Sequence, residues 1–266
     1  MKQTAINMKG LEGFTSVIEA DDKLAMAVYG LQGSGKTKLA ITAPDPIGFV
    51  ALDRKARKTV ERISKELGKT VFMPKEDFIR VGNPMELATM KVEQAKIVYR
   101  RHVDSIKMAC FKLYKHPQVR TIVLDTGSQL WEDMLFAHFG RNDRIMPRDR
   151  GAVNQEMIDL LNALSGKHLI ITHKAKEVWR NDKPTGRFEI AGFPHIGYHV
   201  NSMIELKCDS KKEEGDDGRF TLDMILCQDN PAIQGPGGKN LLSDDMISFQ
   251  NLAQLIYPDA DPEEFE

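Results

Sequence analysis

The sequence has few cysteines, almost no net charge and no long apolar run. Its three cysteines, Cys110, Cys208 and Cys227, are too few and too scattered for a disulfide framework, which is typical of a reducing cytoplasm. Because 37 Lys and Arg residues oppose 38 Asp and Glu residues, overall charge does not favour a nucleic-acid partner, and any basic site must be local. No apolar stretch approaches the ~20 residues that span a bilayer, and the N-terminus lacks a signal-peptide core. We therefore expect a soluble cytoplasmic protein without a membrane partner, built as one large α/β domain with additions.

Residues 23–40, KLAMAVYGLQGSGKTKLA, join an apolar run to a glycine-rich turn and then to a helical pattern. Within them Gly30, Gly35, Lys36 and Thr37 have the G-x-x-x-x-G-K-[ST] spacing of a phosphate-binding loop. Glycines leave room for phosphate oxygens, and the start of the following helix presents free N–H groups and the positive end of its dipole. The pattern predicts a nucleoside triphosphate, most simply ATP, bound with Mg²⁺.

The loop chemistry assigns a role to each side chain. Lys36 is expected to reach the β- and γ-phosphate oxygens, and the Thr37 hydroxyl to hold Mg²⁺, which takes few protein ligands. A chance glycine-rich turn is the alternative, but the strand-loop-helix context disfavours it. The residues predicted to contact the nucleotide are Gly30, Leu31, Gln32, Gly33, Ser34, Gly35, Lys36, Thr37 and Lys38.

Three further apolar segments predict buried strands at residues 47–52, 121–125 and 168–173. The middle segment, TIVLD, ends in Asp125, and an acid at this place in a nucleotide-binding fold holds a water of the Mg²⁺ shell. Thr37 and Asp125 are therefore the predicted metal-binding residues.

Helical spacing predicts a long amphipathic helix over residues 85–113 and a final helix over residues 245–256. Residues 202–227 have the pattern of a β-hairpin with a mobile, charged turn. We divide the chain into a lead-in at residues 1–22, an ATPase domain at residues 23–257 and an acidic, disordered tail at residues 258–266.

The order of these motifs resembles the RecA-like ATPases, and among them the phage-encoded nucleotide-binding proteins that act as single-strand annealing ATPases. VYGLQGSGKTKLA, GFVALD, TIVLDTGSQLWED, LIITHKAKEVW and GFPHIGYHVNSMIEL carry the resemblance, which covers about residues 24–226. It implies an α/β fold: a RecA-like P-loop NTPase core with a mostly parallel central sheet flanked by helices, plus the C-terminal β-hairpin. The strand ending at His173 would lie between the phosphate-loop strand and the Asp125 strand.

The resemblance also implies a catalytic set of Lys36, Asp53, Asp125 and His173. His173 would point at the γ-phosphate as a sensor, where RecA-like proteins usually carry glutamine; a satisfied buried histidine is the alternative. Asp53 matches the glutamate that activates the attacking water, and because aspartate is shorter, slow hydrolysis is expected. The alternative for Asp53 is a cap of the next helix.

Two polar segments, residues 140–151 and 174–193, match the DNA-binding loops of this family. Basic side chains would follow the phosphates of single-stranded DNA and Trp179 would stack on a base, which contributes ~1–3 kcal/mol per base. Ordinary solvated surface is the alternative. The predicted DNA-binding residues are Arg141, Arg144, Arg148, Arg150, Lys174, Lys176, Trp179 and Arg180.

The resemblance further implies a homo-oligomer, a ring or a filament, in which a neighbouring subunit supplies a basic residue to the ATP site. By position in the sequence Lys239 is the candidate. Phe265, in the acidic tail, is a candidate contact for a single-strand DNA-binding protein, with a solvated tail as the alternative. His195 and His199 suggest zinc only weakly, because the spacing is irregular and no C-x-x-C pair exists.

The leading hypothesis is a Mg²⁺-dependent ATPase that binds single-stranded DNA and promotes annealing or strand exchange in phage recombination. A small-molecule kinase is the second hypothesis, with the arginines of residues 140–151 as a lid over a phosphate acceptor. The third is a nucleotide-gated DNA-binding or packaging component with negligible turnover. ATP hydrolysis with and without single-stranded DNA separates the three.

Overall fold

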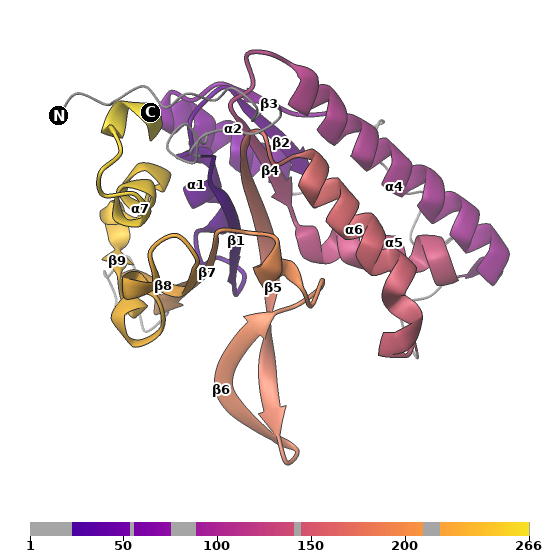
Figure 1. The fold of residues 1–266 in the computed structure, drawn as a ribbon. Helices are drawn as coiled ribbons and strands as arrows, with labels where there is room; N and C mark the ends of the chain where they lie inside the picture. Colours follow the sequence, from indigo (N-terminus) through magenta and orange to yellow (C-terminus); the bar gives the residue numbers. More distant parts are fainter. Residues whose placement is uncertain (1–22, 54–55, 76–88, 141–144, 210–218, 266) are drawn as a thin grey trace, which may run out of the picture.

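The computed structural model describes residues 23–53, 56–75, 89–140, 145–209 and 219–265. Nine strands of these residues form one sheet in the order β3-β2-β4-β5-β1-β7-β8-β9, with β6 paired to β5 beside this path (Figure 1). The strands are β1 (Ala25–Gly30), β2 (Ile47–Ala51), β3 (Val71–Phe72), β4 (Thr121–Asp125), β5 (His168–Arg180), β6 (Lys183–Ile190), β7 (Ser202–Asp209), β8 (Arg219–Cys227) and β9 (Leu242–Ser243).

The central part of this sheet is parallel, as predicted. Strands β1, β2, β3, β4, β5 and β7 pair in parallel, whereas β6, β8 and β9 join in antiparallel pairs. Strand β5 lies between β1 and β4, and β7 with β8 forms the expected hairpin. The α/β fold with a mostly parallel sheet is therefore confirmed.

Helices cover both faces of the sheet because its inner strands are apolar on both sides. Along β4, Val123 packs into one core with α1, α2 and α7, whereas Ile122 and Leu124 pack into a second core with α4, α5 and α6 (Figure 1). This alternation has the strand period of two. The helices are α1 (Lys36–Ile41), α2 (Ala56–Leu67), α4 (Val92–Lys115), α5 (Gly127–Phe139), α6 (Gly151–Ala163) and α7 (Phe249–Ile256).

The segment of residues 174–193 is not the expected loop. Strand β5 continues past His173 to Arg180, reverses at Asn181 and Asp182, and returns as β6. These two turn residues have φ values of 52° and 58°, which suits the tight turn of a two-residue hairpin. We call residues 174–190 the arm, because they extend beyond the parallel core as a separate ribbon (Figure 1).

The acidic tail also differs from expectation. Residues Pro262–Phe265 form a 3-10 turn, and the side chain of Phe265 is only 1% exposed. Its ring lies edge-on to His168 and stacks on Tyr257, with centroids 6.4 Å and 6.1 Å away. Burial of an aromatic ring outweighs the solvation of its acidic neighbours. Phe265 is therefore part of the core and is not presented to a partner.

Other expectations are met only in part. Helix α7 begins at Phe249 and not at residue 245, because the Ser248 hydroxyl caps it by accepting a hydrogen bond from the Asn251 amide at 3.2 Å. The lead-in at residues 1–22, residues 85–88 of the long helix and the turn at residues 210–218 lie outside the described residues. No helix in the described part of the chain has the length and apolarity to cross a membrane.

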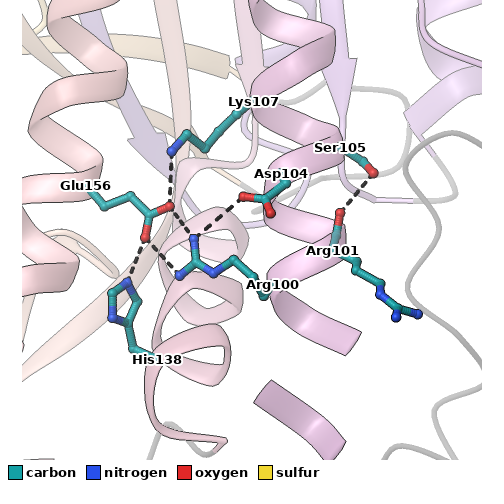
Figure 2. A network of polar contacts seen from close by, with 7 residues as sticks. All are labelled: Arg100, Arg101, Asp104, Ser105, Lys107, His138 and Glu156. Carbon is teal, nitrogen blue, oxygen red and sulfur yellow. Dashed lines mark hydrogen bonds and ion pairs between the residues drawn. The ribbon is translucent and has the colours of Figure 1, made fainter. Parts of the chain in front are cut away.

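A charged network joins the three helices on one face of the sheet (Figure 2). Glu156 of α6 accepts hydrogen bonds from Arg100 at 2.6 Å and 3.1 Å, from Lys107 at 3.1 Å and, across to α5, meets His138 at 2.7 Å. Burial alone would raise the pKa of Glu156, but these three donors outweigh it and lower the pKa to about 2. The carboxylate thus ties α4, α5 and α6 together.

Glu156→Gln should lower the free energy of unfolding by about 2 kcal/mol near neutral pH, because hydrogen bonds to charged groups contribute ~1.5–3 kcal/mol. This contribution is fully present above the ordinary pKa of 4.5 and is lost as the pH falls toward about 2, so wild type and variant should converge in acid. Urea denaturation across this pH range measures the difference.

The control is Glu93→Gln. The Glu93 side chain is 79% exposed and pairs with Lys96 at 2.8 Å on the surface, so its loss should cost at most ~0.5 kcal/mol. Equal losses in the two variants would contradict a special role for Glu156.

Candidate nucleotide-binding site

The predicted phosphate loop connects the end of β1 to the start of α1. Gly35 has φ 91°, a left-handed conformation that a side chain would strain. A Cβ atom on Gly30 would come within 2.2 Å of the Leu206 carbonyl oxygen and 2.5 Å of Ser34 Oγ. The two glycines therefore allow the sharp turn and the close approach of β7 to the loop.

Lys36 folds back over this loop. Its Nζ donates hydrogen bonds to the carbonyl oxygens of Gly30 and Leu31, both at 2.8 Å, and lies 3.4 Å from Ser34 Oγ. Partial burial lowers the pKa of Lys36, and the negative charge of Asp125 opposes that shift. The ammonium group is thus held at the loop, near the acid at the end of β4.

The loop suits a polyphosphate. Helix α1 has no side-chain cap and no acidic residue in its first turn, so no side chain of the helix blocks its first N–H groups. Thr37 lies partly buried in this first turn. Of the other predicted contacts, Ser34 is buried, whereas Leu31, Gln32, Gly33 and Lys38 are exposed.

Two acids lie where the neighbouring parallel strands β2 and β4 end. Asp125, the last residue of β4, is only 6% exposed and accepts a hydrogen bond from the Thr172 hydroxyl. Burial raises the pKa of Asp125, the Thr172 hydrogen bond and the Lys36 charge lower it, and the charge of Asp53 raises it again. Asp53 follows β2, whose Ala51 pairs with Asp125. The structure therefore brings Lys36, Asp53 and Asp125 into one electrostatic neighbourhood.

Thr172 is the contact that sequence reasoning missed. The parallel register pairs Asp125 of β4 with Thr172 of β5, so the hydroxyl lies directly beside the acid. Part of the signal was present in the sequence, since the apolar runs of residues 121–125 and 168–173 are both expected to end at the same edge of a parallel sheet, although β5 itself continues past that edge. Their register, however, is set only in the folded sheet.

His173 faces the opposite side of β5, which corrects its expected orientation. Successive side chains of a strand point to opposite faces. The imidazole is completely buried, and a Cβ atom on Gly127, at the start of α5, would come within 2.7 Å of its Cε1. Burial lowers the pKa of His173 to about 4, and a hydrogen bond with the Ala191 backbone acts in the other direction. The ring is therefore a buried, neutral histidine that supports α5.

The predicted DNA-binding residues are unequally placed. Arg141 and Arg144 lie outside the described residues. Arg148, in the 3-10 turn Pro147–Arg150, is exposed, whereas Arg150 donates a hydrogen bond to the Ile145 carbonyl at 2.9 Å.

The other predicted DNA-binding residues lie on the arm. Lys176 pairs with Glu189 at 3.0 Å, Lys174 and Arg180 are exposed, and the Trp179 side chain is 62% exposed. A hollow of about 520 Å³ on this arm is lined by Val178, Trp179, Arg180, Thr185 and Arg187.

Three further candidates, Lys239, His195 and His199, lie on other parts of the fold than the phosphate loop. Lys239 is exposed in the turn before β9, next to Asn240, whose amide donates to Asp223 at 2.8 Å. The rings of His195 and His199 lie against Phe193, at 5.7 Å and 6.0 Å. Within the described ranges no three His, Cys, Asp or Glu side chains gather as a metal cluster.

Comparison with known proteins identifies a protein family for this chain. A family model described as an AAA domain matches residues 22–210, a span that includes the phosphate loop, Asp53 and Asp125. No curated protein matches the chain.

Replacing His173 by glutamine should weaken the pH dependence of stability. The ordinary pKa of 6.5 falls to about 4 in the folded protein, so between these values the folded state binds fewer protons than the unfolded state. Stability from this residue is therefore fully present above the ordinary pKa and falls by about 3 kcal/mol as the pH drops through this window. Urea denaturation at a series of pH values should show a smaller fall in the variant; an equal fall in both proteins would contradict a neutral, buried ring.

Proposed function

The chain belongs to the AAA domain family and carries an AAA-type P-loop ATPase domain; from this premise we propose that it is a Mg²⁺-dependent ATPase that acts on single-stranded DNA. We further propose that it promotes annealing or strand exchange, as a member of the phage-encoded single-strand annealing group. The observation that carries the ATPase proposal is the meeting of Lys36, Asp53 and Asp125 beside the uncapped start of α1.

Each side chain at the site has a task in ATP hydrolysis. When ATP binds, the Lys36 ammonium group would leave the carbonyl oxygens of Gly30 and Leu31 and donate its hydrogen bonds to phosphate oxygens. Hydrogen bonds to these charged oxygens are stronger than those to neutral carbonyl oxygens. Thr37 and Asp125 would hold a hydrated Mg²⁺, which would supply charge neutralisation when bound with ATP. Asp53, exposed beside Asp125, orients the attacking water.

Binding of single-stranded DNA is assigned to the arm. An exposed indole offers a stacking surface for a base, and Arg180 and Arg187 line the same hollow as Trp179 and supply positive charge for phosphates. Lys174 and Arg148 extend the basic surface. Because the net charge of the chain is only −1, the positive track has to be local.

Turnover is proposed to need a second copy of the chain, in a ring or a filament. Lys239 is exposed near β9, the last strand of the sheet, on the far side of β7 and β8 from β1. An exposed cation at the edge of the sheet is suited to reach the nucleotide of a neighbouring subunit, where it stabilises charge that develops during hydrolysis.

Lys36→Ala should weaken ATP binding about 10- to 100-fold, because it removes charge-assisted hydrogen bonds of ~1.5–3 kcal/mol. Isothermal titration calorimetry with ATP and Mg²⁺ measures this loss. Asp53→Asn should bind ATP like wild type but hydrolyse it more slowly, and Lys65→Ala, on the exposed surface of α2, should leave both unchanged. Wild-type affinity in Lys36→Ala would refute the assignment of the phosphate loop.

Single-stranded DNA should increase ATP turnover, and the increase should shrink as salt rises. Trp179→Ala should weaken DNA binding about tenfold, since one stacked base contributes ~1–3 kcal/mol.

Lys239→Ala should keep DNA and ATP binding but lose the DNA-dependent turnover. Trp131→Phe, in the core, is the control for loss of an indole. Steady-state hydrolysis and fluorescence anisotropy of labelled DNA measure these effects.

The same assays separate the competing functions. Hydrolysis that ignores DNA, together with phosphate transfer to a nucleoside or another metabolite, would indicate a small-molecule kinase. Binding of ATP and DNA without turnover would indicate a nucleotide-gated binding or packaging component. Either outcome would overturn the DNA-dependent ATPase.

A further inference from the structure

The hydroxyl of Ser128 lies where the arm leaves the parallel core, and it is bonded to Lys174 at the start of the arm and to Ala191, the residue that follows β6. Ser128 Oγ accepts a hydrogen bond from the Lys174 amide at 2.9 Å and donates one to the Ala191 carbonyl oxygen. The Ala191 amide in turn donates to the Lys174 carbonyl oxygen at 2.9 Å. Ser128 is only 1% exposed and belongs to the first turn of α5. One side chain therefore closes the base of the arm.

A second bond joins the same two segments at the nucleotide site. Asp125, three residues before Ser128, accepts a hydrogen bond from Thr172, two residues before Lys174. The Asp125–Thr172 and Ser128–Lys174 bonds thus tie β5 to the end of β4 and the start of α5. One bond involves the acid assigned to the metal, and the other involves the arm.

The residues between these two hydrogen bonds are tightly packed. A Cβ atom on Gly127 would lie 2.5 Å from Ile171 Cγ2 and 2.7 Å from His173 Cε1, and one on Gly192 would lie 3.1 Å from the Ser128 Cα. Close-packed contacts transmit a displacement and do not absorb it. A shift of the Asp125 carboxylate relative to Thr172 therefore changes the position of β5 against α5, and with it the geometry at Ser128.

We propose that Ser128 is a positioning residue that couples occupancy of the nucleotide site to the arm. This inference rests on the proposed nucleotide-binding function. In the nucleotide-free protein Asp125 is compensated by the Thr172 hydroxyl and the Lys36 charge. When a nucleotide binds, its phosphates would draw Lys36 away from Asp125, and a hydrated cation would lie beside Asp125. The nucleotide-free and nucleotide-bound states would therefore differ in the contacts that Asp125 makes with Lys36 and Thr172. Ser128 passes this difference to Lys174, where the arm begins, and to Ala191, directly after the arm ends.

Amide hydrogen exchange of the full chain tests the coupling, with and without Mg²⁺ and an ATP analogue whose β–γ bridge cannot be hydrolysed. In wild type the analogue should change exchange across residues 174–180. In Ser128→Ala, exchange at Lys174 should be about tenfold faster without nucleotide, because its acceptor is lost. The analogue should then produce no further change in the arm, although calorimetry shows binding within about twofold of wild type.

Two further variants separate coupling from simple loss of structure. Thr172→Val keeps the shape of the side chain and removes the bond to Asp125, so the arm should again stop responding to the analogue while the Ser128 bonds remain. Ser165→Ala removes an exposed hydroxyl that donates to the Asn162 carbonyl at 2.9 Å, and it should behave like wild type.

Several results would overturn the inference. In Ser128→Ala, a looser arm that still responds to the analogue would show that Ser128 only stabilises the fold. A wild-type arm that ignores a bound analogue would refute the coupling and leave the ATPase proposal intact. Absence of any heat with the analogue would remove both.

Discussion

Asp125 and Lys36 have opposite charges and lie partly buried beside the phosphate loop. The rest of the candidate nucleotide-binding site depends on the closeness of these two groups. Burial raises the pKa of the acid and lowers that of the amine, and each charge opposes the shift of the other. A buried charge without a partner is costly, so the two groups hold each other in position. Their meeting requires β1 and β4 on either side of β5, which is the strand order of the sheet.

The helices keep this edge of the sheet in register. Three of them pack on one face through an apolar core, and Glu156 and the His102–Asp133 pair, at 3.2 Å, add polar links between them. Helix α5 has a double role, because it starts directly after Asp125 and its Ser128 holds the base of the arm. The site and the arm therefore share one support.

Of three differences from the sequence-based expectations, two arise from long-range packing and one arises from a local hairpin. Thr172, and not His173, faces Asp125, because the register of two strands 47 residues apart decides which side chain meets the acid. The segment after His173 forms an arm, because its polar residues pair across a two-residue turn. Phe265 is buried despite its acidic neighbours, because His168 and Tyr257 offer its ring an aromatic surface. In the first and third cases the partner lay far away in the chain, whereas the arm forms between residues that are close in sequence.

The sequence by itself determined the features that depend on neighbouring residues. The phosphate loop follows from the glycine, lysine and threonine spacing, and short apolar runs predicted the buried strands, whose mostly parallel sheet was implied by the resemblance to RecA-like ATPases. Only the tertiary structure decided which side chain of β5 faces Asp125, that Ser128 holds the base of the arm, and that Phe265 of the tail is buried. The period of a strand tells that Thr172 and His173 point to opposite faces, but it does not tell which face lies next to Asp125. That choice is made by the register of β4 and β5 and by the glycine at residue 127, which lets α5 approach His173.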